Sequence, residues 1–412
     1  MKTRVDILVF GATGFTGKFT VRQLALLTKE KYLDVTWGIA GRSKEKLENL
    51  VRDIRNTGLD IKNVPVIECD VDNEESLKNM LRVTKVVINC TGVNIILSPK
   101  IVKGCIETRT HYVDISSEIF HILSLYRSYN KPAKNANVLV IPSCGFSSIP
   151  IEAGMIHLDK KFKGTLHSVE CYVEHFSPTS LPIEPLGHSG TWTSCVHVLL
   201  TLKESLSLKK EILPKSKESK AEKIKRPFFF HNNGQLWFPW PGIENDTVQM
   251  SQQHLYEESG KKPIHFDAYT TFEKWYYFFI ILGMYIYYYL CNFKCFAKLL
   301  INYPRVFTFG FISEKGPTNE MTQKLKFRFL LNGIGWEAGD QNCEPTKTMS
   351  VKVSGRDPYD STAIAVIMSA ITIIKESSNI PKGGVIMPGA AFYKTDLVDR
   401  LMNNGYTIEV LK

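Results

Sequence analysis

The chain has 412 residues, of which 44% are hydrophobic and 22% are charged, and its formal net charge is +10. This length exceeds what one hydrophobic core usually supports, so we expect two domains. The mild basic excess suits a cofactor phosphate or an anionic membrane surface as well as nucleic acid, for which no zinc-finger or RNA-recognition pattern is present. We therefore predict no nucleic-acid partner. The nine cysteines form no CxxC pair, which indicates a reducing compartment and no metal site.

The first predicted element is a buried strand over 5–10, and a glycine-rich turn follows it directly. Three glycines recur at three-residue spacing, and the pattern predicts a helix over 18–28. A strand, a tight glycine turn and a helix N-terminus aimed at a pyrophosphate make a dinucleotide site. An ordinary glycine-rich turn is the alternative. We predict that the cofactor contacts Gly11, Thr13, Gly14, Phe15, Thr16 and Gly17.

The second predicted strand, over 35–40, ends in Gly41, Arg42 and Ser43. A site selective for NAD usually places an acid at this strand end to hold the ribose 2′-hydroxyl. A cation there favours a 2′-phosphate instead. We therefore predict that Arg42 and Ser43 contact the cofactor and that NADP(H) is favoured over NAD(H). Alternatively, Arg42 is only a solvated residue at the start of the next helix.

Strands and helices go on alternating up to residue 145. This alternation implies parallel βαβ units and an α/β fold whose first domain, 1–145, is a doubly wound Rossmann sheet. Asp70 follows the third strand and either contacts adenine or caps the next helix. Thr91 and Gly92 follow the fourth strand, where backbone approaches the cofactor. The further strands are predicted over 64–69, 86–90, 112–115 and 138–141, and the further helices over 44–55, 73–81, 99–107 and 119–129.

A second α+β domain is predicted over 146–380, because strand-like runs there become longer and alternate more regularly. The runs over 167–175 and 322–331 favour a mixed or antiparallel sheet, and a helix is expected over 361–375. We expect the C-terminal segment, 381–412, to return to the Rossmann domain.

Two segments of the second domain have the composition of regions that contact a membrane surface. The segment 208–226 holds eight Lys or Arg against three Glu, which is typical of a solvated loop or a membrane-surface patch. The run over 275–291 has seventeen residues without a charge, somewhat short of the ~20 that span a bilayer. Its tyrosines suit the headgroup interface. We predict a membrane-embedded or interfacial helical segment over 275–303; a buried helix or an oligomer interface is the alternative.

The sequence gives weak signals for catalytic groups. None of the seventeen tyrosines has a lysine four residues on, which argues against short-chain dehydrogenase chemistry. No G-x-S-x-G elbow or paired-histidine metal motif is present. A nicotinamide reductase can work through orientation and electrostatics. This leaves Glu118, Ser147 and Ser148 as weak catalytic candidates, followed by His188 and Tyr112, each of which could equally be a cap, turn or core residue.

The ordered set of motifs resembles the saccharopine dehydrogenase-like oxidoreductase family over essentially the whole chain. The matching pieces are VFGATGFTGKF (9–19), AGRSKEKL (40–47), VINCTG (87–92), YVDIS (112–116), GFSSIP (145–150), GTW (190–192), KGPT (315–318) and MPGAAF (387–392). The resemblance implies a Rossmann domain, a second domain whose sheet covers the cofactor cleft, and a hydrophobic segment associated with lipid droplets. Related bacterial members are trans-acting enoyl reductases, which implies a lipid-like substrate.

The chain departs from the family pattern in three loops. The loop over 93–100 lacks the family's proline-tyrosine stretch, Ser117 stands where the family has glycine, and Ser147 replaces an acid. Two functions remain. The first is an NADP(H)-dependent oxidoreductase at a lipid surface, acting on a lipid-like, imine or enoyl substrate. The second is a catalytically silent lipid-droplet or membrane-associated Rossmann protein with a scaffold or cofactor-sensing role. We expect the protein to lie on a lipid droplet or membrane and to face the cytosol, with the mitochondrion as the alternative location. The sequence is compatible with a homodimer.

Overall fold

The computed structural model describes residues 4–29, 34–59, 61, 63–176, 184–213, 226–271, 276–337 and 344–411. The chain forms two compact units, each built from separate stretches of sequence. The first unit comprises Met1–Ser116, His121–Ile149 and Tyr359–Asn404, and the second comprises Ser117–Phe120, Pro150–Pro358 and Gly405–Lys412. The basic segment predicted over 208–226 lies for the most part outside the described residues, and so does the beginning of the predicted segment 275–303.

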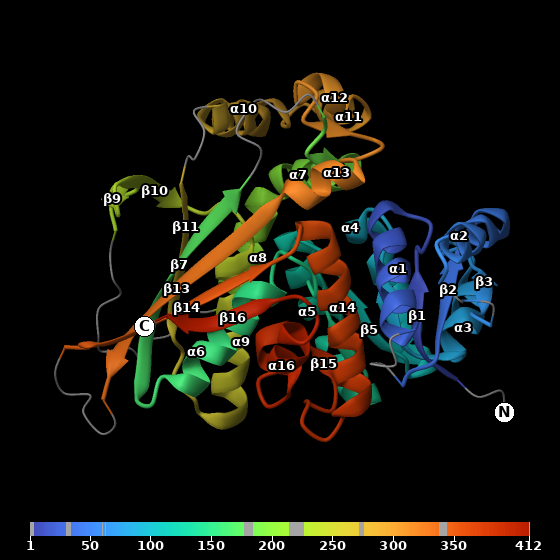
Figure 1. Ribbon diagram of the computed structural model, residues 1–412, viewed down its shortest axis with the longest axis horizontal. Coiled ribbons are helices and arrows are strands. Elements are labelled where there is room, and N and C mark those ends of the chain that lie inside the picture. Colours follow the sequence, from blue (N-terminus) through green and yellow to red (C-terminus); the bar gives the residue numbers. More distant parts are fainter. Residues whose placement is uncertain are drawn as a thin grey trace. The chain divides into compact units, whose positions relative to one another are not determined.

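The first unit contains a seven-stranded sheet in the order β15-β6-β5-β4-β1-β2-β3, and all its printed pairings are parallel (Figure 1). Apart from the added strand β15, this is the doubly wound order of a Rossmann fold, with its switch point between β1 and β4. The predicted parallel α/β domain is confirmed. The strands are β1 (Val5–Phe10), β2 (Trp37–Gly41), β3 (Val66–Glu68), β4 (Thr84–Asn89), β5 (His111–Asp114), β6 (Leu139–Ile141) and β15 (Gly384–Val385).

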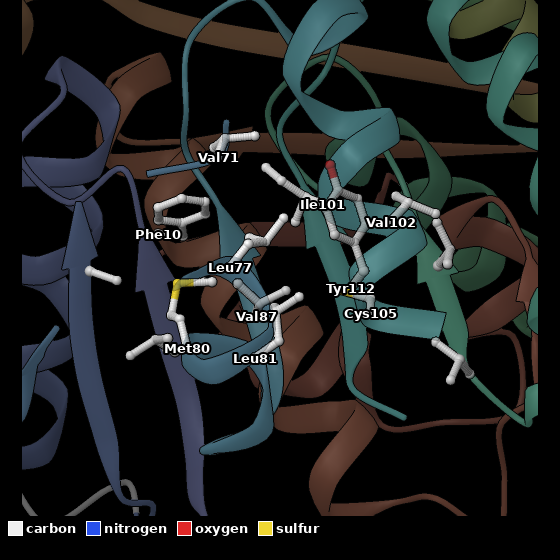
Figure 2. Close-up of a cluster of buried hydrophobic side chains, with 14 of the residues drawn as sticks. Phe10, Val71, Leu77, Met80, Leu81, Val87, Ile101, Val102, Cys105 and Tyr112 are labelled. Atoms are coloured by element: carbon white, nitrogen blue, oxygen red, sulfur yellow. The ribbon is translucent and has the colours of Figure 1, made fainter. Parts of the chain in front are cut away.

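A buried core joins this sheet to the helices between its strands. Figure 2 shows the ring of Tyr112, from β5, among Ile101, Val102 and Cys105 of α4. Leu77, Met80 and Leu81 of α3 belong to the same core. The helices of this unit are α1 (Phe15–Lys29), α2 (Lys44–Asn56), α3 (Glu74–Arg82), α4 (Asn94–Thr108), α5 (Ile119–Ala136), α14 (Pro358–Lys375), α15 (Pro388–Ala391) and α16 (Leu397–Met402). Helix α14 begins with Pro358, at the end of the second unit.

The second unit contains a mixed seven-stranded sheet in the order β16-β14-β13-β7-β11-β10-β9. Only the pair β7 and β11 is parallel; the other printed pairings are antiparallel. The predicted second mixed sheet is confirmed. Its strands are β7 (Thr165–Phe176), β9 (Phe230–Asn232), β10 (Gln235–Pro239), β11 (His265–Thr271), β13 (Lys326–Trp336), β14 (Lys347–Gly355) and β16 (Thr407–Leu411). A small separate sheet pairs β8 (Gly187–His188) with β12 (Ile312–Ser313).

The helices of the second unit form two groups. One group packs on the sheet: a Cβ on Gly154 of α6 would lie 2.8 Å from Val353 and 3.0 Å from Leu331, and Ser251 of α9 donates a hydrogen bond to Glu152 of α6. The other group packs around α7. The helices are α6 (Ile149–Lys161), α7 (Ser189–Leu200), α8 (Leu202–Ile212), α9 (Glu244–Ser259), α10 (Tyr276–Leu290), α11 (Lys294–Asn302), α12 (Pro304–Phe307) and α13 (Asn319–Lys324).

Several predicted boundaries were wrong for local reasons. The strand expected from residue 322 begins only at Lys326, because the Thr318 side chain caps the short helix α13 by accepting a hydrogen bond from the Met321 N–H. Helix α4 begins at Asn94, so Pro99 lies inside this helix and does not start it. Helix α1 begins at Phe15, three residues earlier than expected.

The domain boundaries differ from the expected ones as well. Helix α14, expected within 146–380, lies almost entirely in the first unit. Its Asp360 accepts a hydrogen bond from Gln23 of α1, and its Thr362 accepts one from the Phe146 N–H. The last residues of the chain, with β16, belong to the second unit, where β16 pairs with β14.

The hydrophobic segment expected as one helical stretch is divided. Helix α10 ends at Leu290, and α11 starts again at Lys294 after a turn. Among the residues that the structure describes, no helix combines the length and apolar character needed to cross a bilayer.

Candidate functional site

The glycine-rich turn sits at the carboxyl end of β1, where its own backbone and the backbone that follows β4 leave no room for side chains at two glycines. Gly11 has φ +82, and a Cβ placed there would lie 2.7 Å from the Cys90 carbonyl carbon and the Thr91 nitrogen. A Cβ on Gly17 would lie 2.2 Å from the Gly11 oxygen. Both positions therefore require glycine. The chain passes through this turn directly into α1, whose first backbone N–H groups have no partner within the helix.

The other predicted residues of the turn have different surroundings. Thr13 and Thr16 are half-buried, and Gly14 is exposed. The Phe15 ring contacts Phe19 at 5.3 Å and Tyr359 at 4.9 Å between ring centroids. The side chain of Phe15 thus packs against other rings, and only the backbone N–H of Phe15 could bind an anion.

The carboxyl end of β2 is rich in cations. Arg42, Lys44 and Lys46 are all exposed at the start of α2, and Ser43 caps this helix by accepting a hydrogen bond from the Lys46 N–H at 3.3 Å. The Lys100 ammonium, 2.5 Å from Asp72, holds the pKa of that carboxyl below its usual value, and the charge of Arg42 contributes to the shift. A helix N-terminus with three cations favours a phosphate.

The structure also locates Asp70, Thr91 and Gly92. The helix after β3 is capped by Asn73, so the alternative that Asp70 caps it is wrong. Asp70 is exposed and accepts a hydrogen bond from the Asp72 N–H at 3.0 Å. No described atom lies within 4 Å of a Cβ built on Gly92, so this position faces open space. The next residue, Val93, has φ 55, a strained conformation for a β-branched side chain.

A chain of buried hydrogen bonds leads from Thr91 into β5. The Thr91 hydroxyl donates to Asn89 Oδ1 at 2.7 Å, and Asn89 Nδ2 donates to the Tyr112 hydroxyl at 2.9 Å. The Tyr112 hydroxyl in turn donates to Asp114 Oδ2 at 2.7 Å. All but Thr91 are fully buried. Burial and the neighbouring Asp114 raise the pKa of Tyr112 well above its ordinary value, so this phenol stays protonated and acts as a donor.

Asp114 joins the loops that follow β5 and β6. Its Oδ1 accepts hydrogen bonds from the Ser116 N–H and hydroxyl and from the Ser143 N–H, at 2.7–2.9 Å. Burial alone would raise the pKa of Asp114, but the neighbouring His121 and Ser116 outweigh it and hold the pKa below its usual value. The His121 Nε2 lies 3.6 Å from the carboxylate. The positive φ of Ser143, 61°, persists in this fully buried loop because Asp114 fixes its N–H.

The three catalytic candidates have distinct surroundings. The Ser147 hydroxyl lies 3.4 Å from that of Ser143 and 3.5 Å from the Ser116 carbonyl oxygen. Ser148 is buried, and its hydroxyl has no hydrogen-bond partner among the described residues. Glu118 belongs to the second unit and is buried, accepting hydrogen bonds from its neighbour's N–H at 2.9 Å and from the Ser194 hydroxyl of α7 at 2.7 Å. Ser147 and Ser148 therefore share the first unit, whereas Glu118 is anchored to α7.

His188 has a structural role. Its Nδ1 accepts a hydrogen bond from the Gly190 N–H at 2.9 Å and caps α7. Burial lowers the pKa of His188, which favours the neutral imidazole that a cap acceptor requires.

Sequence reasoning missed Asn89, Asp114 and Ser194. Asn89 and Asp114 end apolar parallel strands, and a polar side chain in such a strand needs an internal partner, so a signal was present. Ser194 carries no such signal, since its partner Glu118 lies far away in sequence.

The residues at the carboxyl ends of β1, β2 and β4 fit a dinucleotide phosphate. The turn at Gly11 is a cradle that a Cβ would fill, Gly92 faces open space, and the cations at α2 suit a 2′-phosphate. Among the described ranges, no three His, Cys, Asp or Glu side chains are grouped to hold a metal ion.

Comparison with known proteins identifies the fold and the family. Residues 7–141 match the family described as Saccharopine dehydrogenase NADP binding domain, so this part of the chain is an NADP(H)-binding domain. The solved apo saccharopine dehydrogenase (L-Glu forming) of Saccharomyces cerevisiae covers 98% of this chain and 99% of its own at a TM-score of 0.52 and 15% identity, a likeness of fold. Among curated relatives, the Caenorhabditis elegans "Lipid droplet localized protein" is 30% identical over 99% of this chain and 98% of its own. The human saccharopine dehydrogenase-like oxidoreductase is 31% identical over 98% of this chain and 97% of its own. The chain therefore belongs to the saccharopine dehydrogenase-like oxidoreductase family.

Proposed function

We propose that the protein is an NADP(H)-dependent oxidoreductase that works at a lipid surface and acts on a lipid-like substrate with an enoyl, carbonyl or imine group. The observation that carries this proposal is the cradle at the switch point of the first sheet. There Gly11 and Gly17 keep side chains away from the turn, and the exposed cations Arg42, Lys44 and Lys46 follow the end of the adjacent strand β2.

The residues at this switch point would divide the binding of the cofactor among them. The turn from Gly11 to Gly17 and the N-terminus of α1 would hold the pyrophosphate. Arg42, with Lys44 and Lys46 near it, would hold the 2′-phosphate. The bound cofactor supplies hydride chemistry.

The buried hydrogen bonds next to the cradle would position the cofactor-facing backbone. Asn89 accepts from both the N–H and the hydroxyl of Thr91, at 3.1 and 2.7 Å, and thereby fixes the chain just before Gly92. Asp114 fixes the loop that carries Ser147 and Ser148 through the Ser143 N–H. Asn89 and Asp114 are therefore positioning residues. Ser147, Ser148 and Glu118 remain the candidates for moving a proton to or from a substrate.

The location and substrate class rest on different support. The C. elegans relative is named for lipid droplets, and the segment 275–303 of this chain is apolar and rich in tyrosine. We propose a cytosol-facing position on a lipid droplet or membrane, which suits a substrate dissolved in lipid.

The catalytically silent Rossmann protein remains a second candidate, and a specific observation favours it. The resemblance of the GFSSIP motif implies an acid where this chain has Ser147, and the Ser147 hydroxyl lies close to the Ser143 hydroxyl and the Ser116 carbonyl oxygen. A cofactor-sensing scaffold would keep the cradle and lose the groups that act on substrate.

Hydride transfer from labelled cofactor separates the two. NADPH carrying deuterium at the reactive carbon of its nicotinamide would be incubated with the protein and with lipid enoyl thioesters, ketones and imines. We expect one class of product to carry a single deuterium, found by mass spectrometry. If NADPH binds but no product in any class gains deuterium, the silent alternative replaces the enzyme.

A further inference from the structure

Helix α10 carries a continuous exposed apolar stripe. Phe279, Leu282, Tyr285, Ile286 and Tyr289 are all exposed, and their spacings of three, four and seven residues place them on one side of a helix. The hydroxyls of Tyr285 and Tyr289 lie 3.0 Å apart on this stripe. A monomeric soluble surface rarely gathers so many large apolar side chains in one place.

The opposite side of α10 is already occupied by the protein. Met284, Tyr287 and Cys291 pack into a cluster with Trp192 and Val196 of α7. The Tyr287 hydroxyl donates to the Phe307 carbonyl oxygen at 2.6 Å, and Trp192 Nε1 donates to the Leu300 carbonyl oxygen at 2.8 Å. The inner side therefore fixes the helices to α7, and the outer stripe is not needed for this packing.

The exposed apolar surface continues beyond α10. Figure 1 shows α11 and α12 following α10, next to α7. Phe309, just after α12, is the most exposed large hydrophobic residue described, at 89%. The others in this stretch are Phe293, Leu299, Tyr303 and Val306. Together with the α10 stripe these residues are called the aromatic face.

All the charged side chains in the sequence of this stretch are positive. Between Glu273 and Glu314 the sequence contains no acid, whereas it contains Lys274, Lys294, Lys298 and Arg305. Lys298 and Arg305 are exposed. Cations beside an apolar, tyrosine-rich face complement an anionic lipid surface.

The length of α10 decides how the face meets lipid. Its fifteen residues span about 22 Å, short of the ~30 Å of a hydrocarbon core, and its inner side is bound to α7. We infer that the aromatic face of α10, α11 and α12 lies flat in the headgroup region of an anionic phospholipid layer and does not cross it. This inference rests on the proposed association with a lipid surface and adds the orientation and the residues that contact lipid.

Flotation with lipid vesicles tests the surface. The probe is phosphatidylcholine vesicles with and without phosphatidylserine, and the variant is the double substitution Leu282→Glu with Ile286→Glu. Its matched control is Leu206→Glu with Val410→Glu, because these side chains are similarly exposed (54% and 40% against 43% and 47%) and lie outside the face. We expect binding to phosphatidylserine vesicles to weaken at least about tenfold in the first variant and to stay unchanged in the control.

Quenching by labelled lipids tests the orientation. An environment-sensitive dye is attached to the thiol introduced by Ile286→Cys. The protein also carries Cys295→Ser, because Cys295 is exposed and would be labelled as well. Quenchers near the headgroup should reduce the emission of the dye more than quenchers at the acyl-chain ends. Stronger quenching at the chain ends would overturn the flat orientation.

Two controls separate this inference from the proposed enzyme. Each variant is titrated with NADPH and unfolded in urea. Retained NADPH binding shows that the first unit is folded, and an unchanged unfolding curve shows that the second unit, which carries the substitutions, is folded as well. If the wild-type protein binds vesicles but does not bind NADPH, the proposed function is overturned and the inference about the lipid face stands. Equal vesicle binding by the two double variants would overturn the lipid face. A wild-type dimer in sedimentation that Leu282→Glu with Ile286→Glu converts to a monomer would overturn it in favour of a contact between copies.

Discussion

Replacing Gly11 with alanine tests whether the glycine turn is built as the structure describes. The substitution places an L-residue at φ +82, which costs about 1–2 kcal/mol. The new Cβ would also lie 2.7 Å from backbone atoms of Cys90 and Thr91, which cannot rotate away, and overpacking of this kind costs about 1–3 kcal/mol. We therefore expect Gly11→Ala to lower the free energy of unfolding by roughly 2–5 kcal/mol and to weaken NADPH binding severely.

Gly58 provides the matched control. It has the same φ, +82, yet no described atom lies within 4 Å of its added Cβ. Gly58→Ala should therefore cost only the conformational part, about 1–2 kcal/mol, and leave NADPH binding unchanged. Urea unfolding and NADPH fluorescence titration of both variants measure the two parts separately. Equal destabilisation by the two substitutions, with equal NADPH affinity, would refute the close approach of the turn to β4.

Three further substitutions probe buried polar groups. Tyr112→Phe removes the hydroxyl that donates to Asp114 at 2.7 Å; we expect a loss of about 1–3 kcal/mol in urea unfolding and weaker NADPH binding. Ser194→Ala removes a donor from a buried carboxylate and should cost about 1–3 kcal/mol. Thr193→Ala should cost less, because the Thr193 hydroxyl donates to the Ser189 carbonyl oxygen of its own helix. Burial raises the pKa of Glu244 from its ordinary value of 4.5 to about 7. Folding therefore takes up a proton between these values, and the stability of wild type relative to Glu244→Gln should fall by up to ~3 kcal/mol as the pH rises from about 4.5 to about 7. A pH-independent difference would contradict the buried location of this carboxyl.

Much of the first sheet could be predicted because local pattern and tertiary structure agree there. From Ile7 to Phe10 the first strand is apolar and buried, as expected for a parallel strand covered on both faces, and the glycine turn follows it without a break. Boundaries failed where a single side chain decided them. The cap by Thr318 turned the start of an expected strand into helix α13, and Pro99 was accommodated inside α4.

The site was less predictable because its side chains act through partners distant in sequence. Glu118 meets Ser194 across 76 positions, and no local pattern reports such a pairing. The segment 275–303 shows a further limit of pattern alone. Its apolar run predicted a lipid-associated helix, but only the structure separates the side of α10 that packs on α7 from the side that is exposed.

Calorimetric titration with NADPH and NADH, on wild type, Arg42→Ala and Arg55→Ala, tests the central claim most directly. Arg42 and Arg55 are both exposed and stand at opposite ends of α2, so the second variant removes the same charge away from the cradle. We predict that NADPH binds wild type more tightly than NADH does. Arg42→Ala should weaken NADPH roughly tenfold to a hundredfold and leave NADH nearly unchanged, while Arg55→Ala changes neither. Absence of NADPH binding, or an equal loss of both cofactors in Arg42→Ala, would contradict the account.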